Sequence, residues 1–188
     1  MQRRYSALGA FIIIVIASIA AWYLMTPAQP GDEGVPADGL EVSSAAFENT
    51  GEIPEKYTGE GQDLSPPLEV SGVKGDYIAV IMDDPDACGF VHWLIWNISA
   101  DTGSIFEGVP RGGTVQAIDG AKQGRNDFGD IGYGGPKPPE GEEHEYRIRV
   151  YTLDQELDLE SGSTKDDLLA EMEDHIVQMT EYLGKYER

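Results

Sequence analysis

The chain has 188 residues, in which 34 Asp and Glu residues outnumber 13 Lys and Arg residues and give a formal net charge of -21. Negative charge of this size repels nucleic-acid phosphates, so the composition excludes sequence-independent binding of DNA or RNA. The single cysteine, Cys88, excludes an intramolecular disulfide and a multi-cysteine zinc site. The length suits one domain, and no internal repeat indicates a second.

The N-terminus carries an uncharged, mostly apolar run at residues 8–25, which follows a basic stub at residues 1–7. As a helix this run would span about 27 Å at ~1.5 Å per residue, which is enough to cross a bilayer. Because Arg3 and Arg4 precede the run and no Lys or Arg follows before residue 40, the pattern predicts a single-pass anchor in the cell membrane. The N-terminus would then be cytoplasmic and the rest extracytoplasmic. A cleaved signal peptide is the alternative, since it has the same basic start and apolar run.

Residues 26–39 are rich in Pro, Gly and acid, which predicts a linker, so residues 40–188 are expected to form the domain. β-branched and aromatic residues predict a mainly β domain, with strands at 40–47, 77–84, 90–99, 114–118 and 145–154. Residues 124–141 contain six glycines and three prolines and predict a long irregular loop. A loop of this length in a compact domain is usually functional.

The C-terminal segment shows a different period. Apolar residues recur there at spacings of three, four and seven, opposite acidic residues, at Leu168, Leu169, Met172, Ile176, Met179 and Leu183. Ser163 or Thr164 can cap a helix at this point, and the acids that follow suit its positive end. The pattern predicts one amphipathic helix from about residue 164 to residue 183.

Acidic and histidine side chains gather around two of the predicted strands. The strand at 77–84 runs into Asp84, Pro85 and Asp86, and His92 follows in the next strand. A carboxylate close to His92 would keep this histidine partly protonated. Such a cluster can bind an anion, bind a metal or move protons. The simpler readings are a solvated Asp-Pro-Asp turn, a core histidine at 92 and a surface histidine at 144.

Several motifs in this order resemble the phosphatidylethanolamine-binding protein family, and more narrowly its bacterial and archaeal branch, often described as Raf kinase inhibitor-like. The resemblance runs from about residue 40 to the C-terminus and is carried by residues 56–61, 64–68, 83–88, 90–99, 124–141, 144–154 and 168–188. It implies a β-sandwich of two antiparallel sheets with peripheral helices. It also implies a small anion-binding pocket at one end of the sheets.

The resemblance further implies which residues form that pocket. The two aspartates would orient histidines that donate to the anion, the proline would shape the turn, and the glycine-rich loop would form the rim. Residue by residue, the family's ligand-binding positions fall on Asp84, Pro85, Asp86, His92, Gly134, Gly135, Pro136, His144 and Tyr146.

Two positions depart from the family's motifs. Cys88 stands where the motif has a proline, and Glu145 stands where it has an arginine. Strand alternation places Tyr146 and Glu145 on opposite faces, so Glu145 is expected to point away from the pocket and to pair with Arg147.

The expected function is therefore non-catalytic binding of a small phosphate-bearing or carboxylate-bearing ligand, with no cofactor and no metal. A regulated protein partner, such as a peptidase or another surface protein, is implied by the resemblance alone. One alternative is a metal-dependent hydrolase that uses Asp84, Asp86, His92 and His144. Another is a purely structural surface module.

Overall fold

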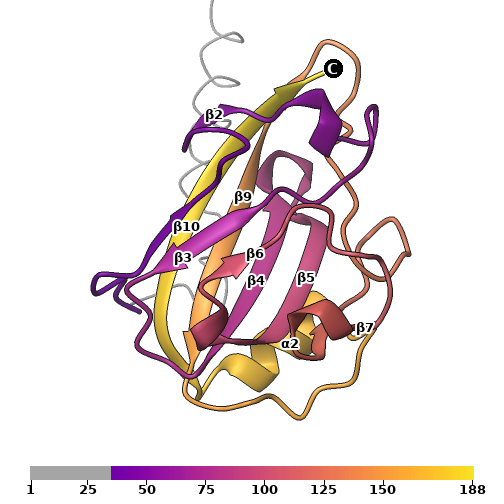
Figure 1. The fold of residues 1–188 in the computed structure, drawn as a ribbon. Coiled ribbons are helices and arrows are strands. Elements are labelled where there is room, and N and C mark those ends of the chain that lie inside the picture. Colours follow the sequence, from indigo (N-terminus) through magenta and orange to yellow (C-terminus); the bar gives the residue numbers. More distant parts are fainter. Residues whose placement is uncertain (1–34) are drawn as a thin grey trace, which may run out of the picture. The chain divides into compact units, whose positions relative to one another are not determined.

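The computed structural model describes residues 35–188, whose strands form two sheets (Figure 1). The smaller sheet has the strand order β1 (Glu41–Ser43), β3 (Leu68–Ser71), β6 (Ser104–Ile105). The larger sheet has the order β2 (Gly51–Glu52), β10 (Ile176–Glu187), β9 (Glu143–Leu153), β4 (Tyr77–Asp84), β5 (Phe90–Ser99), β8 (Ala121–Gln123), β7 (Thr114–Val115). Among these strands β2 pairs in parallel with β10, and the other neighbours pair antiparallel.

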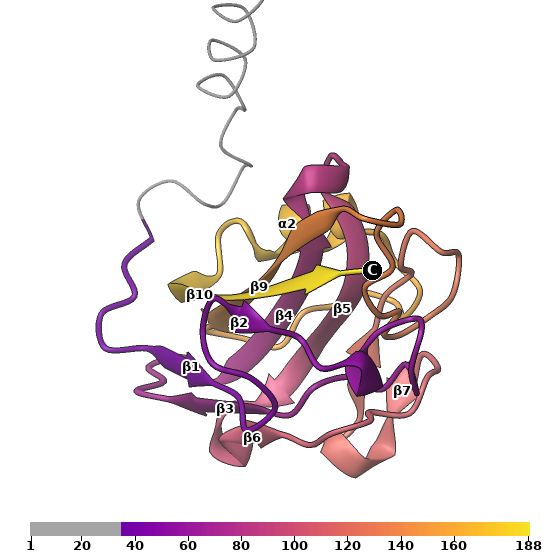
Figure 2. The ribbon, with the colours of Figure 1, turned by 90° about the horizontal axis from the view of Figure 1, so that it is seen from above.

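The larger sheet has a hydrophobic core on each face. On one face its side chains pack against the smaller sheet, as Leu68 and Val70 of β3 do with Val80 of β4. On the other face the helix α2 (Lys165–Met172) and the preceding loop provide the cover, through residues such as Leu157 and Leu168. Figure 2 shows the smaller sheet and α2 on opposite sides of the larger one. The predicted mainly β sandwich with a peripheral helix is therefore the observed architecture of this part of the chain.

The central strands match their prediction most closely. The segments 77–84 and 90–99 are β4 and β5, and 145–154 lies within one or two residues of β9. The segments 40–47 and 114–118 form only the short strands β1 and β7. The second of these continues as a 3₁₀ turn, η4 (Gln116–Ile118); the other 3₁₀ turns are η1 (Glu55–Tyr57), η2 (Pro85–Ala87) and η3 (Ala100–Thr102). The loop at 124–141 contains no helix or strand beyond one isolated bridge, between Arg125 and Ile131, as the glycines and prolines predicted.

The predicted fold needs a correction at its N-terminal end. Within residues 35–188, every helix is too short or too polar to cross a membrane. The run at 8–25, for which a transmembrane helix was predicted, lies outside the described residues, together with the stub at 1–7 and most of the linker. The described fold therefore contains no membrane-spanning helix. The predicted single-pass location, which depended on that helix, is withdrawn with it.

The predicted C-terminal helix is wrong in its second half. The helix α2 begins at its Thr164 cap as expected, with a capping box between Thr164 and Asp167, but it ends at Met172. Residues 176–187 form β10, which pairs with β9 along nearly its whole length. The buried positions there are all even-numbered, at Gln178, Tyr182, Gly184 and Tyr186, so they share one face of a strand. β-branched and aromatic residues in the segment favour that strand.

Two β-bulges interrupt β5 and change which face its side chains occupy. The first lies where the register with β4 shifts between Met82 and Asp83, so Val91 and Trp93 have consecutive partners and His92 is the extra residue. Strict alternation would place His92 on the face of Leu94, towards α2. The bulge instead directs it to the face of Trp93, between the two sheets, where it meets Tyr146. The second bulge contains Asn97, whose φ of 58° is left-handed.

Candidate functional site

The turn after β4 supplies the first carboxylate of the site. Asp84 ends the strand, and its Oδ1 accepts a hydrogen bond from the Ala87 backbone N–H at 3.0 Å, which caps η2. Pro85 begins this short helix, where a missing N–H costs nothing. Cys88 ends it with a φ of 58°. Proline, whose φ is fixed near −65°, cannot adopt this conformation, so the exposed cysteine matches the observed turn.

Asp84 also holds His144 at the start of β9. The His144 Nδ1 atom donates to Asp84 Oδ2 at 2.7 Å, and both side chains are buried. Burial alone would lower the pKa of His144, but the carboxylates of Asp84, Glu142 and Asp86 together raise it above its ordinary value. The reading of His144 as a surface histidine is therefore wrong. Its Nδ1 is used by Asp84, so only Nε2 can meet a ligand.

Asp86 has a different role from the one expected. Its Oδ2 accepts a hydrogen bond from the Glu145 backbone N–H at 2.8 Å, so it fixes the β9 backbone next to His144 and does not orient an imidazole. The side chain of Glu145 does not meet Arg147 as predicted, because Arg147 pairs with Asp83 and Glu181. Asp86 therefore positions the backbone of β9 and makes no direct hydrogen bond with a histidine among residues 35–188.

His92 is oriented by a carbonyl group. Its Nδ1 donates to the backbone oxygen of Gly134 at 2.7 Å, and the side chain is 3% exposed. Burial lowers the pKa of His92, and the Gly134 carbonyl and the charge of Asp84 offset this only in part. The expectation that a carboxylate keeps His92 partly protonated is therefore not met. A neutral His92 with its proton on Nδ1 presents Nε2 as a hydrogen-bond acceptor.

Tyr146 contacts both histidines from the centre of the cluster. Its ring meets His92 edge-on with a centroid distance of 5.1 Å and stacks on His144 at 6.5 Å. The hydroxyl group is fully buried and lies near the Asp84 carboxylate, which is close enough to act on its pKa, but no well-aligned hydrogen bond joins the hydroxyl to any residue in the described part of the chain. Burial, and then the charge of Asp84, raise the pKa of Tyr146, so the hydroxyl keeps its proton. A buried hydroxyl without a partner is costly, and it is a donor that a ligand can use.

Two aromatic side chains border His92. Phe90 and Phe128 contact each other at 4.8 Å, and their centroids lie 5.3 Å and 5.5 Å from that of His92. Phe128 is 48% exposed, which places the aromatic pair at the surface of the site. Gly134 follows in the same loop, and a Cβ atom there would lie 2.6 Å from the Phe128 ring. The residue type at 134 therefore lets the aromatic ring approach the loop.

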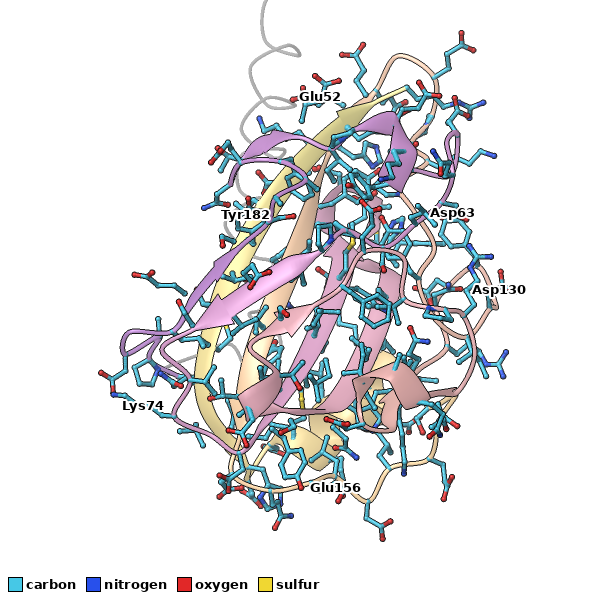
Figure 3. All side chains as sticks on the ribbon, in the orientation of Figure 1. Glu52, Asp63, Lys74, Asp130, Glu156 and Tyr182 are labelled. Atoms are coloured by element: carbon cyan, nitrogen blue, oxygen red, sulfur yellow. The ribbon has the colours of Figure 1, made fainter. Side chains whose placement is uncertain are left out.

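The rest of the loop is held by contacts that the sequence analysis did not anticipate. The Gly135 N–H donates to Asp63 Oδ1 at 2.6 Å, and the Pro136 carbonyl accepts from the Gly59 N–H at 2.9 Å. Arg111 joins Asp63 through an ion pair and the Tyr133 carbonyl through its Nε at 3.0 Å. Arg111 also lies 3.8 Å from Asp130, and both carboxylates, which are labelled in Figure 3, lie on loops at the same side of the molecule. Only tertiary contact connects these segments, so no sequence signal singled them out.

A second polar cluster lies on the opposite face of β4. Asp83 is fully buried, and its carboxylate accepts from Arg147 Nε at 3.1 Å, Arg149 Nη2 at 2.6 Å and Lys165 Nζ at 2.5 Å. Burial would raise the pKa of Asp83, but the three cations hold it below its ordinary value. The adjacent residues Asp83 and Asp84 thus face opposite sides of the sheet. The first fixes α2 through Lys165, and the second belongs to the candidate site.

The structure therefore brings together Asp84, His92, His144, Tyr146 and Gly134 in direct contact, whereas Pro85, Asp86, Gly135 and Pro136 shape the backbone around them. Residues missing from the sequence-based set are Glu142, Asp63, Phe90 and Phe128. Within residues 35–188, His, Cys, Asp and Glu side chains form no group of three or more with metal-binding geometry. The fold and the cluster define a β-sandwich protein whose larger sheet carries, at one end, two buried histidines in contact with a tyrosine and bordered by two phenylalanines.

Comparisons with known proteins agree with this class. The family described as phosphatidylethanolamine-binding protein matches residues 43–187. The UPF0098 protein PH1269 of Pyrococcus horikoshii is 46% identical over 154 residues, which cover 79% of this chain and 77% of that protein. The chain therefore belongs to the phosphatidylethanolamine-binding protein family.

Two solved structures show the same fold. The crystal structure of CT736 from Chlamydia trachomatis, described as a homolog of this family, is 34% identical with a TM-score of 0.72. The E. coli protein YbcL, described as a new member of the mammalian family, is 29% identical with a TM-score of 0.74. Each comparison covers 80% of this chain and 99% of the other. The family resemblance identified from the motifs is thus confirmed.

Proposed function

We propose that the domain binds a small phosphate-type anion at the site formed by Asp84, His92, His144 and Tyr146. The observation that carries this proposal is the fully buried Tyr146 hydroxyl, which lies near the Asp84 carboxylate but makes no well-aligned hydrogen bond with any described residue. A ligand oxygen beside it would satisfy the hydroxyl. Family membership supports a ligand-binding role in general, and the identity of the ligand is the part proposed here.

The two histidines offer different chemistry to such a ligand. His144, with its pKa raised, is a charged donor at Nε2 once its Nδ1 is held by Asp84. His92, with its pKa lowered, is an acceptor at Nε2. Hydrogen phosphate carries both acceptor oxygens and a hydroxyl donor, so it can use both histidines and Tyr146 together. Acetate has no hydroxyl hydrogen and can use only the donors.

The role proposed is binding and not catalysis. Among the described residues, no Ser, Thr or Cys side chain hydrogen-bonds to His92 or His144, so neither histidine is paired with a nucleophile. The alternative of a metal-dependent hydrolase gains no support from this geometry. A regulated protein partner, such as a peptidase, stays a prediction.

Isothermal titration of the full chain with inorganic phosphate, phosphoethanolamine and acetate at about pH 6 tests the proposal. We expect phosphate to bind, and Tyr146→Phe and His144→Gln each to weaken it by roughly tenfold, since each removes a buried hydrogen bond or a charged one. His175→Gln is the matched control, because His175 pairs with Asp154 in a turn outside the site. An absence of heat with all three compounds would sink the proposal.

A further inference from the structure

Glu142 faces the nitrogen of His144 that a ligand would need. Its Oε2 lies 3.5 Å from His144 Nε2, whereas His144 Nδ1 already donates to Asp84. The two ring nitrogens of an imidazole point in different directions, so Asp84 and Glu142 approach opposite sides of the ring. The outer side of His144, the one available to an anion, is thus occupied by a carboxylate of the chain itself.

The two carboxylates are held very differently. The Asp84 side chain is 4% exposed and is fixed by hydrogen bonds to His144 and to the Ala87 N–H. The Glu142 side chain is 61% exposed, and its contact with His144 is the single ion pair at 3.5 Å. An exposed ion pair of this kind contributes little to stability, so the carboxylate can leave at low cost.

The backbone nevertheless keeps Glu142 next to the site. The Gly141 N–H donates to the backbone oxygen of Arg188 at 2.8 Å, and the Glu142 N–H donates to the Pro139 carbonyl at 3.2 Å. Gly141 itself has a φ of +79°, the left-handed conformation that a tight turn needs. This turn leads directly into β9, which carries His144. The side chain of Glu142 is therefore free to swing while its Cα stays in place.

We propose that Glu142 is an internal competitor that occupies the donor side of His144 and is displaced when an anion binds. This inference rests on the proposed function and adds a residue that sets its affinity. A protein whose binding-competent state is only partly populated binds its ligand more weakly by that fraction. Glu142 also places a negative charge where the anion must enter, which adds to the effect.

The opposite role for Glu142 makes a different prediction. A carboxylate near His144 also favours the charged imidazolium, so Glu142 could support anion binding. Asp84 already provides this effect from a buried position at 2.7 Å, whereas Glu142 acts from an exposed position at 3.5 Å. Competition for Nε2 is therefore the stronger consequence of Glu142. The two roles differ in the sign of the change when the Glu142 charge is removed.

The test compares phosphate binding by the full chain, Glu142→Gln and Glu140→Gln at about pH 6 by isothermal titration. We expect Glu142→Gln to bind inorganic phosphate roughly three- to tenfold more tightly, because the competitor is gone. Glu140 lies in the same turn and is exposed, so Glu140→Gln controls for the general loss of negative charge and should change affinity less than about twofold. An NMR titration of His144 should show a lower pKa in Glu142→Gln than in Glu140→Gln, which reports the contact in solution.

The outcomes separate the inference from the proposed function. If the parent binds phosphate and Glu142→Gln binds it equally or more weakly, the competitor role of Glu142 is refuted. The proposed anion site is then still supported. An unchanged His144 pKa in Glu142→Gln would also refute the competitor role, since the contact would then be absent. No binding by either the parent or Glu142→Gln would overturn both proposals, because a vacated donor would still take no anion.

Discussion

Asp84 Oδ2 and His144 Nδ1 lie 2.7 Å apart and join the end of β4 to the start of β9 across sixty residues of sequence. Because both side chains are buried, the pair is shielded from water, and the carboxylate fixes both the orientation and the proton of the imidazole. This contact directs the His144 Nε2 atom outward. The affinity of the candidate site for an anion therefore depends on a residue that does not itself donate to the anion.

Asp84→Asn should lower the pKa of His144 while keeping the cap on η2, since the Asn carbonyl can still accept from the Ala87 N–H. Charged hydrogen bonds are worth about 1 kcal/mol more than neutral ones, so phosphate affinity at neutral pH should fall by roughly fivefold. NMR titration of His144 and calorimetry measure the two effects. An unchanged His144 pKa in this variant contradicts the prediction.

Anion binding should weaken as the pH rises. The folded-state pKa of His144 lies above its ordinary value, so its charge, and the stability that the charge contributes, are fully present below about pH 6.5. Both are lost as the pH rises through the folded-state pKa. Sulfate is the best probe, because its own charge does not change between about pH 6 and about pH 8.5. His144→Gln should abolish the pH dependence, and a pH-independent affinity in the parent would count against a charged His144 donor.

Asp83→Asn should destabilise the domain by about 3–5 kcal/mol at neutral pH, because it leaves Arg147, Arg149 and Lys165 without their buried carboxylate. The pKa of Asp83 is lowered in the folded state, so its contribution is present above about pH 4 and is lost as the pH falls through the folded-state value. The difference in the free energy of unfolding between the parent and Asp83→Asn should therefore become smaller in acid. Urea unfolding at several pH values measures it. Glu181→Gln, which removes a 3.8 Å contact with Arg147, should change stability by less than about 1 kcal/mol.

Gly135→Ala should displace the loop that holds His92. A Cβ atom at this position would lie 2.6 Å from the Tyr57 carbonyl oxygen and 2.8 Å from the Thr58 Cα atom, and neither backbone atom can move easily. We expect a loss of about 1–3 kcal/mol in stability, with weaker phosphate binding as the Gly134 carbonyl shifts away from His92. Gly59→Ala is the control, because its Cβ would meet mainly the flexible Lys137 side chain at 3.3 Å. Equal behaviour of the two variants would show that the loop tolerates the change.

Gln178→Leu should destabilise the domain without affecting the site. The buried amide donates to the carbonyls of Ala37, Asp38 and Gly72 and accepts from the Lys74 N–H at 2.7 Å, so leucine would leave these groups unpaired. The cost should be about 2–4 kcal/mol in urea unfolding, with phosphate affinity per folded molecule unchanged. Gln155→Leu replaces an exposed amide and should be near neutral. A small effect of Gln178→Leu would mean that water replaces these bonds.

The sequence by itself determined the central strands β4, β5 and β9, the long loop at 124–141 and the family. The apolar runs of β4 and β5 are long enough to predict their type and bounds, and alternation in β9 correctly separates Tyr146 from Arg147. Local patterns also located Asp84, His92 and His144 as chemistry-bearing residues. These features depend on residue type and near neighbours, which a linear pattern contains.

Tertiary structure decided the features in which distant segments compete for the same side chain. The apolar spacing after Met172 fits a helix, but pairing with β9 satisfies a whole row of backbone groups and makes β10 a strand. A bulge in β5 turned His92 towards Tyr146, and the Gly134 carbonyl replaced the expected carboxylate. The contact of Glu142 with the outer nitrogen of His144 likewise follows from a turn anchored at Arg188. Sequence periodicity carries no information on such contacts, because they depend on register and on backbone bonds between segments far apart in the chain.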